Sequence, residues 1–227
     1  MSYWVNVAVD GPSGAGKSSV CKAVASMLSY TYIDTGAMYR AVGYCALTSG
    51  IDVTNEAQLM AYLPTLTLSF DENNCICANG KCVEDYIRSE QVSLAASSVA
   101  KLASVREYCV QMQRVMAQNG NCIMDGRDIA SVVLPNANVK IYLDASVDVR
   151  GKRRYQQNIE KGMACNLDEV IADIAKRDEQ DMNRANSPLV RVKEAYYLDS
   201  SDLTFEQTVN QMIEVIQTTI NKEVMDD

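Results

Sequence analysis

Short apolar runs alternate with longer amphipathic stretches along most of the chain. The apolar runs predict buried strands, because each is short and bounded by turn residues or polar residues; they cover residues 5–9, 30–33, 121–124, 139–143 and 195–198. Apolar residues at helical spacing predict helices over residues 17–28, 38–47, 55–63, 89–117, 147–161, 167–183 and 205–224. Strands that alternate with helices indicate an α/β fold, with a five-stranded parallel sheet flanked by helices.

A different pattern interrupts this alternation. Residues 65–86 contain short apolar pieces separated by polar turns, and Asn79-Gly80 is a strong signal for a two-residue hairpin. We expect three antiparallel strands there, at about residues 65–70, 74–78 and 81–85. An ordinary surface hairpin would give the same pattern. Its position between the second and third strands of the parallel sheet favours a small β insert.

Composition narrows the classes of function. The 227 residues carry a net charge of −8 at pH 7, which argues against a general nucleic-acid-binding protein. Any binding of polyanions must therefore rely on arginines and lysines gathered near particular motifs. No apolar run approaches the roughly 20 residues of a membrane helix, and the amino-terminal segment does not resemble a signal peptide. We therefore expect a cytoplasmic protein.

The chain has eight cysteines and no histidine. Without histidine, the Ser-His-Asp and Cys-His mechanisms are excluded. Cys75, Cys77 and Cys82 cluster, but no pair has C-x-x-C spacing. The expectation at this point is reduced thiols in a cytosolic protein, with a zinc site disfavoured.

One motif carries clear chemistry. It has the form G-x-x-x-x-G-K-S between a predicted strand and a predicted helix, which is the context of a phosphate-binding P-loop. Backbone N–H groups of such a loop bind phosphates, its lysine bridges the terminal phosphates, and its serine hydroxyl ligates Mg²⁺. Asp125 ends an apolar strand and is placed to support Mg²⁺ through water. The expected ATP-binding residues are Gly11, Pro12, Ser13, Gly14, Ala15, Gly16, Lys17, Ser18 and Ser19.

The acceptor of the phosphoryl group is a separate question. A GTPase would need an N-K-x-D motif, and the chain has none. An ATP-binding regulatory protein would leave no small-molecule acceptor site, whereas a small-molecule kinase would place arginines around a cleft. Three stretches fit the kinase: DTGAMYR (34–40), MDGRD (124–128) and KRDEQDMNR (176–184). The first two follow predicted strands, at the sheet edge where α/β proteins bind ligands.

The third stretch is predicted to be helical. Arg177, Asp181 and Arg184 have the spacing i, i+4, i+7, which puts them on one helix face. Such a face suits a diol and a polar base. By themselves, these charges indicate an exposed helix face with ion pairs, which would contribute under ~1 kcal/mol to the stability of the protein.

These stretches together resemble the bacterial cytidylate kinases. The resemblance rests on DGPSGAGKSS, DTGAMYR, SLAASSVA, DGRDIASVV, IYLDAS and RDEQDMNRANSPL, in that order over about residues 5–220. It implies a P-loop nucleoside monophosphate kinase that uses ATP and Mg²⁺ to phosphorylate CMP and dCMP in pyrimidine nucleotide metabolism. A kinase for UMP, AMP or a shikimate-like acceptor stays open as an alternative, as does a regulatory ATP-binding protein.

The resemblance also implies roles for individual residues. Arg40 and Arg127 would hold the acceptor α-phosphate. The residues expected around cytosine are Thr35, Arg106, Asp128 and Arg184, and those expected at the ribose are Ser97, Arg177 and Asp181. The ordinary alternatives are close helix packing for Ser97 and a surface charge for Arg106.

A basic run, RGKRR at residues 150–154, resembles the lid of nucleoside monophosphate kinases. We expect catalytic cations at Lys17, Arg127, Arg150 and Arg154, with Arg153 a further candidate in the lid. The expected organisation is one P-loop kinase domain over 1–227, with a core of 1–63, 87–147 and 186–227, a monophosphate-binding β insert of 64–86, and a lid with its following helix over 148–185. The expected partners are small nucleotides rather than nucleic acid or membrane, and the expected state is a monomer.

Overall fold

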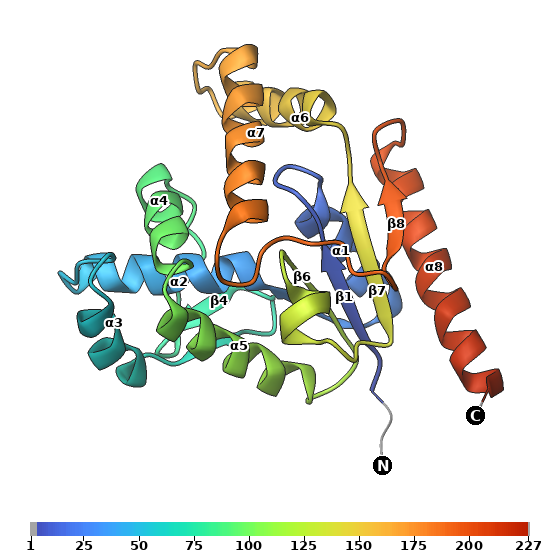
Figure 1. Cartoon of the computed structure of the whole chain (residues 1–227), viewed down its shortest axis with the longest axis horizontal. Coiled ribbons are helices and arrows are strands. Elements are labelled where there is room, and N and C mark those ends of the chain that lie inside the picture. The colour runs from blue at the N-terminus through green and yellow to red at the C-terminus, as the bar shows by residue number, and fades with distance from the viewer. Residues whose placement is uncertain (1–3, 227) are drawn as a thin grey trace. The chain divides into compact units, whose positions relative to one another are not determined.

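A five-stranded parallel sheet, in the strand order β2-β6-β1-β7-β8, forms the centre of the fold in the computed structural model (Figure 1). Its strands are β1 (Asn6–Asp10), β2 (Thr31–Asp34), β6 (Cys122–Gly126), β7 (Val139–Asp144) and β8 (Tyr196–Asp199). The structure describes residues 4–226. The predicted α/β class and the five parallel strands are confirmed, with strand ends displaced by one or two residues.

The register of the central strands decides where the functional loops lie. β1 pairs in parallel with β6, and Asp10 lies opposite Gly126. On its other side β1 pairs in parallel with β7, where Asp10 lies opposite Tyr142. The carboxyl ends of these neighbouring strands therefore lie at one edge of the sheet, where ligands bind in α/β proteins.

The chain divides into two compact units. The first comprises Met1–Tyr32 and Asn121–Asp227, and the second comprises Ile33–Gly120. Besides strands, the first unit contains α1 (Lys17–Leu28), a π-helical turn η2 (Ile129–Val133), α6 (Val147–Glu160), α7 (Leu167–Asn183) and α8 (Phe205–Asp226). No helix among residues 4–226 is long and apolar enough to cross a membrane.

The core of the first unit lies between the sheet and two helices. Alternate strand residues such as Val7, Val9 and Ile141 are fully buried against apolar residues of α1 and α8. Helix α8 lies alongside β8 in Figure 1. Val24 of α1 and Met212 of α8 belong to the same cluster, so the two helices cover one face of the sheet. This packing fixes the start of α1, where the P-loop ends.

The second unit contains helices and a small antiparallel sheet. Its helices are α2 (Thr35–Thr48), α3 (Glu56–Tyr62), the 3₁₀ turn η1 (Leu63–Thr65), α4 (Glu90–Val99) and α5 (Ala103–Ala117). The sheet has the order β3-β4-β5, from β3 (Leu68–Phe70), β4 (Ile76–Ala78) and β5 (Lys81–Cys82). The three predicted antiparallel strands are therefore present but shorter, and the helical pattern over 89–117 is divided into α4 and α5.

Local signals explain several of these boundaries. The side chains of Asp34 and Asn55 cap α2 and α3 by accepting the N–H groups of Ala37 and Gln58. Helix α2 therefore begins three residues before the predicted start. Asn79 and Gly80 both have positive φ, of 49° and 75°, as a two-residue hairpin turn requires.

Candidate active site

The P-loop connects β1 to α1 and depends on its glycines. Gly11, Gly14 and Gly16 all have positive φ, which side chains rarely adopt. A Cβ on Gly11 would also lie 2.0 Å from the carbonyl oxygen of Leu143. The loop can take this path only with glycine at these positions, and the predicted phosphate loop has the backbone that its motif requires.

Lys17, the first residue of α1, is buried beneath this loop. Its Nζ donates hydrogen bonds of 2.7 Å to the carbonyl oxygens of Gly11 and Pro12. Burial, and then the positive charge of Arg127, lower the pKa of Lys17 to about 7, although Asp125 and Asp10 oppose the shift. Phosphate groups bound at the loop would place negative charge beside this ammonium and so favour its charged form.

Ser18 follows Lys17 and contacts the acid at the end of β6. Its hydroxyl donates to Oδ2 of Asp125 over 3.0 Å, while the Tyr32 hydroxyl donates to Oδ1 of Asp125 over 2.8 Å. The serine and the aspartate that the sequence predicts as magnesium residues therefore lie in contact. Both offer hard oxygen ligands of the kind that Mg²⁺ prefers, so the residues present fit this ion.

Tyr32 was not predicted from the sequence. It lies in β2, where a tyrosine reads as an ordinary strand residue. Its hydroxyl binds the carboxylate oxygen of Asp125 that Ser18 does not contact, as outer-shell partners orient metal ligands.

Asp10 is a buried acid at the end of β1, and its role was not predicted from the sequence. Its carboxylate accepts the backbone N–H groups of Ile129 and Ala130, both over 2.8 Å. Burial raises its pKa to about 6, and nearby Asp128 adds to the shift, while the two backbone hydrogen bonds and Lys17 oppose it. Asp10 thus ties the end of β1 to η2, the turn that follows the DGRD segment.

Arg127 and Asp181 form an ion pair. Nε of Arg127 donates to Oδ2 of Asp181 over 2.8 Å, and its Nη1 donates to the carbonyl of Gly126 over 3.2 Å. About one fifth of each of the two side chains is exposed, so both remain accessible to a ligand. Arg177 lies half-buried one turn earlier on α7.

Asp128 and Arg184 form a second pair, with 3.6 Å between Oδ1 and Nη2. Arg184 also donates from Nε to the carbonyl of Ser187. The prediction that Arg184 lies on a helix face with Arg177 and Asp181 is wrong. Helix α7 ends at Asn183, and Arg184 is extended, with φ −66° and ψ 142°. Its charge therefore reaches Asp128 from the segment after the helix.

Arg150 lies in the interior rather than on the surface of α6. Its Nε donates to the carbonyl of Ala145 over 2.7 Å, and its Nη1 donates to the carbonyl of Ser13 over 2.8 Å. Nη1 also pairs with Asp178, whose other carboxylate oxygen accepts the N–H of Ser13. Asp178 was missed, because one more acid among the charges of α7 gives no signal of its own. The pair ties α6 and α7 to the P-loop.

The other lid arginines differ from Arg150. Arg153 donates to the carbonyl of Ser200 over 2.7 Å, whereas Arg154 is exposed. Helices α6 and α7 also approach closely: a Cβ on Gly151 would lie 2.3 Å from Ile171. Figure 1 shows these two helices crossing steeply. Of the three arginines, Arg154 has the guanidinium that faces solvent.

In the second unit, the predicted acceptor residues lie along α2, α4 and α5. Thr35 is the buried first residue of α2, directly after the cap Asp34. Arg88 lies 3.4 Å from Asp34 and also pairs with Glu84. Arg88 gives no local signal in the sequence, because its partner Asp34 precedes it by 54 residues. Arg40 is half-buried one turn into α2.

The structure excludes the ordinary alternatives for Arg106 and Ser97, which were a surface charge and close helix packing. Arg106 is only 5% exposed, with its guanidinium 5.6 Å from the centre of the Tyr39 ring, so it is no surface charge. Helices α2 and α4 pack closely at Gly43, where Ala95 and Ala96 make the contact. Ser97 is exposed and donates to the carbonyl of Ser93. It is therefore not the residue that permits this packing.

Known proteins resemble the chain over nearly its full length. A family model described as cytidylate kinase matches residues 7–218. A cytidylate kinase from Geobacillus sp. (strain WCH70) is 43% identical over 219 residues, covering 95% of this chain and 98% of that protein. A cytidylate kinase from Geobacter sulfurreducens is 44% identical over 214 residues, covering 93% of this chain and 92% of that protein.

Solved structures of lower identity share the fold. A gluconokinase from Sinorhizobium meliloti 1021 matches with a TM-score of 0.52 and 11% identity, over 100% of this chain and 99% of that chain. A shikimate kinase from Bacteroides thetaiotaomicron matches with a TM-score of 0.50 and 17% identity, over 95% and 99%. At these identities the likeness concerns the fold alone.

Proposed function

Because the chain belongs to the cytidylate kinase family, we propose that it transfers the γ-phosphoryl group of ATP to the α-phosphate of CMP or dCMP. The products are ADP and CDP or dCDP. The acceptor is already an anionic phosphate oxygen, so no strong base is needed. The work of the protein is to position two nucleotides and to neutralise their charge.

One observation carries this proposal. Asp10, which directly precedes the P-loop, lies opposite Gly126, which directly precedes Arg127 and Asp128. The donor loop and the first acceptor residues therefore begin on neighbouring strands at the same sheet edge. A transfer between two bound phosphates requires this adjacency.

On the donor side, Gly11 to Ser19 bind the ATP phosphates through backbone N–H groups and Lys17. Ser18 and Asp125 would hold Mg²⁺, directly or through water, and Tyr32 keeps the Asp125 carboxylate turned toward Ser18. The ion, when bound, neutralises phosphate charge and fixes the orientation of the donor. Asp10 supports the same region by holding the N–H groups of Ile129 and Ala130.

On the acceptor side, we assign two sets of residues. In the first unit, Arg127 binds the α-phosphate, Asp128 and Arg184 bind cytosine, and Arg177 with Asp181 binds the ribose. In the second unit, the assigned residues are Arg40 for the phosphate, Thr35 and Arg106 for the base, and Ser97 for the ribose.

The Asp128–Arg184 pair gives this assignment its chemical logic. Cytosine presents an amino donor beside an acceptor ring nitrogen, which suit a carboxylate and a guanidinium respectively. Uracil presents a carbonyl in place of the amino group, so Asp128 would face another acceptor. A buried mismatch of that kind costs about 1–3 kcal/mol.

Charge neutralisation during transfer is assigned to Lys17, Arg127, Arg150 and Arg154. Arg154, exposed on the lid, is free to turn toward the phosphates. The contacts of Arg150 with Ser13 and Asp178 favour an additional positioning role for this residue. Closure of the lid (residues 148–185) would exclude water, which competes as an acceptor.

We also propose that the chain is a cytoplasmic monomer. All eight cysteines are free thiols, as in proteins of reducing compartments. Light scattering coupled to gel filtration measures the oligomeric state.

The reaction itself is tested by ADP release from ATP·Mg²⁺ with CMP, dCMP, UMP, AMP and shikimate offered separately. The proposal expects fast turnover with CMP and dCMP. Fast turnover with shikimate or AMP but not CMP would refute the assigned acceptor. Slow turnover with every acceptor, together with tight ATP binding, would refute transfer to a small molecule.

A further inference from the structure

The β insert of the second unit carries three cysteines that phosphoryl transfer does not use. Cys77 of β4 lies opposite Cys82 of β5 in the antiparallel register. Cys75 precedes Cys77 by two residues, and side chains two apart on extended backbone project from the same face. Three thiols therefore gather on one face of the hairpin.

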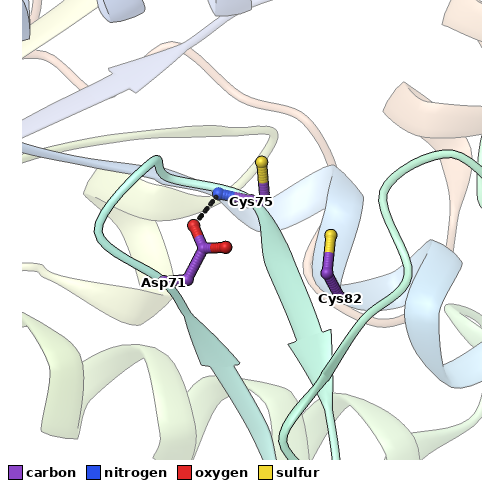
Figure 2. Close-up of side chains that lie close together, drawn as sticks. All are labelled: Asp71, Cys75 and Cys82. Carbon is purple, nitrogen blue, oxygen red and sulfur yellow. Dashed lines mark hydrogen bonds between the residues drawn. The ribbon is translucent and has the colours of Figure 1, made fainter.

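Asp71, in the turn after β3, adds a carboxylate to this group (Figure 2). One ligand atom each of Asp71, Cys75 and Cys82 lie within 4.8 Å of one another. Tetrahedral zinc, with bonds of about 2.0–2.3 Å, holds its ligand atoms roughly 3.4–3.8 Å apart. The upper bound of 4.8 Å exceeds this spacing by roughly 1–1.4 Å, so the three atoms would approach one another when an ion binds.

The Asp71 carboxylate is held in place by the turn. Its Oδ1 accepts the backbone N–H groups of Asn73 and Cys75, each over 2.9 Å, and Figure 2 shows the bond from Cys75. Both of these hydrogen bonds use Oδ1, and Oδ2 is the oxygen that the site offers to a metal. Fixed carboxylates of this kind bind metals better than mobile ones, because less orientation is lost on binding.

The site is also accessible, and its atoms select a class of ion. Cys82 is exposed, while Asp71 and Cys75 are half-buried. Thiolates favour zinc-like ions over Mg²⁺, so such a site is distinct from the Ser18–Asp125 pair.

We propose that Asp71, Cys75 and Cys82 bind a thiophilic divalent cation of the zinc class, with solvent in the fourth position. Such a site goes beyond the expectation of reduced thiols alone, because no local sequence pattern shows that Asp71 lies beside the cysteines. The ion would connect the turn after β3 to β5. These strands have only three and two residues, so a metal cross-link stabilises a sheet that is marginal by itself.

Cobalt binding to the full-length chain tests the site. The protein is reduced with a phosphine, freed of metal with a chelator, and titrated with Co²⁺ in excess Mg²⁺, which competes for the oxygen-ligand site. One equivalent should give a thiolate-to-cobalt charge-transfer band, and one equivalent of Zn²⁺ should abolish it. Absence of the band in the wild-type protein would overturn the proposal.

Variants identify the ligands. Cys75→Ser and Cys82→Ser should each reduce the band, because one thiolate ligand remains, and should weaken zinc binding by more than the roughly 10–100-fold that loss of an outer-shell partner costs. The double variant should lose the band. Asp71→Asn should keep the band but bind more weakly, and Cys77→Ser, whose thiol lies outside the group of ligand atoms, should keep the band and the affinity. Cys165→Ser, which changes a half-buried cysteine of the first unit, is the matched control and should behave as wild type.

Hydrogen exchange provides an independent readout. Zinc should slow exchange over residues 68–83 in the wild-type protein and leave it unchanged in Cys82→Ser. Equal loss of binding in Cys165→Ser would contradict the assignment.

Discussion

The Ser18 hydroxyl donates to the Asp125 carboxylate over 3.0 Å, and this contact joins the P-loop to the end of the neighbouring strand β6. The two residues are 107 positions apart in the chain. Parallel pairing of β1 with β6 brings them together, because Val9 lies opposite Asp125. The contact places two oxygen groups of the kind that Mg²⁺ prefers beside the predicted phosphate loop.

Tyr32→Phe should raise the Mg²⁺ requirement of the enzyme. The change removes the hydrogen bond that holds Oδ1 of Asp125 and leaves the ring in place. We expect the Mg²⁺ concentration for half-maximal turnover to rise by roughly 10-fold or more, as for other outer-shell partners of metals.

The matched control for that variant is Tyr30→Phe, one residue before β2 in the same unit. It should keep the wild-type Mg²⁺ dependence. A purely structural role for Tyr32 predicts the other pattern, with lower stability and an unchanged Mg²⁺ requirement.

Asp178→Ala should destabilise the protein by about 3–5 kcal/mol, because it leaves the Arg150 guanidinium buried without its partner. It also removes the acceptor of the Ser13 N–H. Urea unfolding measures the loss. Asp173→Ala, at an exposed position of the same helix, is the control and should change stability by less than about 0.5 kcal/mol. Equal stability of the two variants would contradict the role of the buried pair.

Asp10 should make stability depend on pH. Its pKa is raised to about 6 in the folded protein from 3.8, so the folded state binds this proton more tightly than the unfolded state. The resulting stabilisation is complete below the unfolded pKa and is lost as pH rises through about 6. Between about pH 5 and about pH 7.5 the loss amounts to roughly 1–2 kcal/mol.

Asp10→Asn isolates this effect. The variant lacks the titration, so the stability of the wild-type protein minus that of the variant should fall by this amount over the same pH range. Urea unfolding of both proteins at the two pH values measures the difference. A difference that stays constant or grows with pH would show that the Asp10 pKa is not raised.

The features that were predicted best from the sequence are those that depend on residues close together in the chain. The P-loop is recognised from its glycines and its lysine, which stand in one short stretch of the chain. The Asn79-Gly80 hairpin and the Asn55 cap each depend on one or two residues. The order of strands and helices followed from the apolar pattern, so the fold class was also accessible.

Contacts between distant segments were not accessible in the same way. Asp178 meets Ser13 across 165 residues, and Asp10 meets Ala130 across 120, through register and helix packing that no local pattern encodes. Arg184 was assigned to a helix face because its spacing fits one, yet the helix ends one residue earlier. Asp71 joins the cysteines through a turn whose path depends on the hairpin as a whole.

We propose that Asp128 recognises the cytosine of the acceptor. The ratio of kcat/KM for CMP to that for UMP measures this recognition directly. In the wild-type enzyme the mismatch of about 1–3 kcal/mol predicts a preference for CMP of roughly 5–150-fold. Asp128→Asn should remove most of this preference and leave the Kd for ATP unchanged. Asp173→Asn should retain it. An unchanged ratio in Asp128→Asn, or an equal loss of ATP binding, would contradict the account.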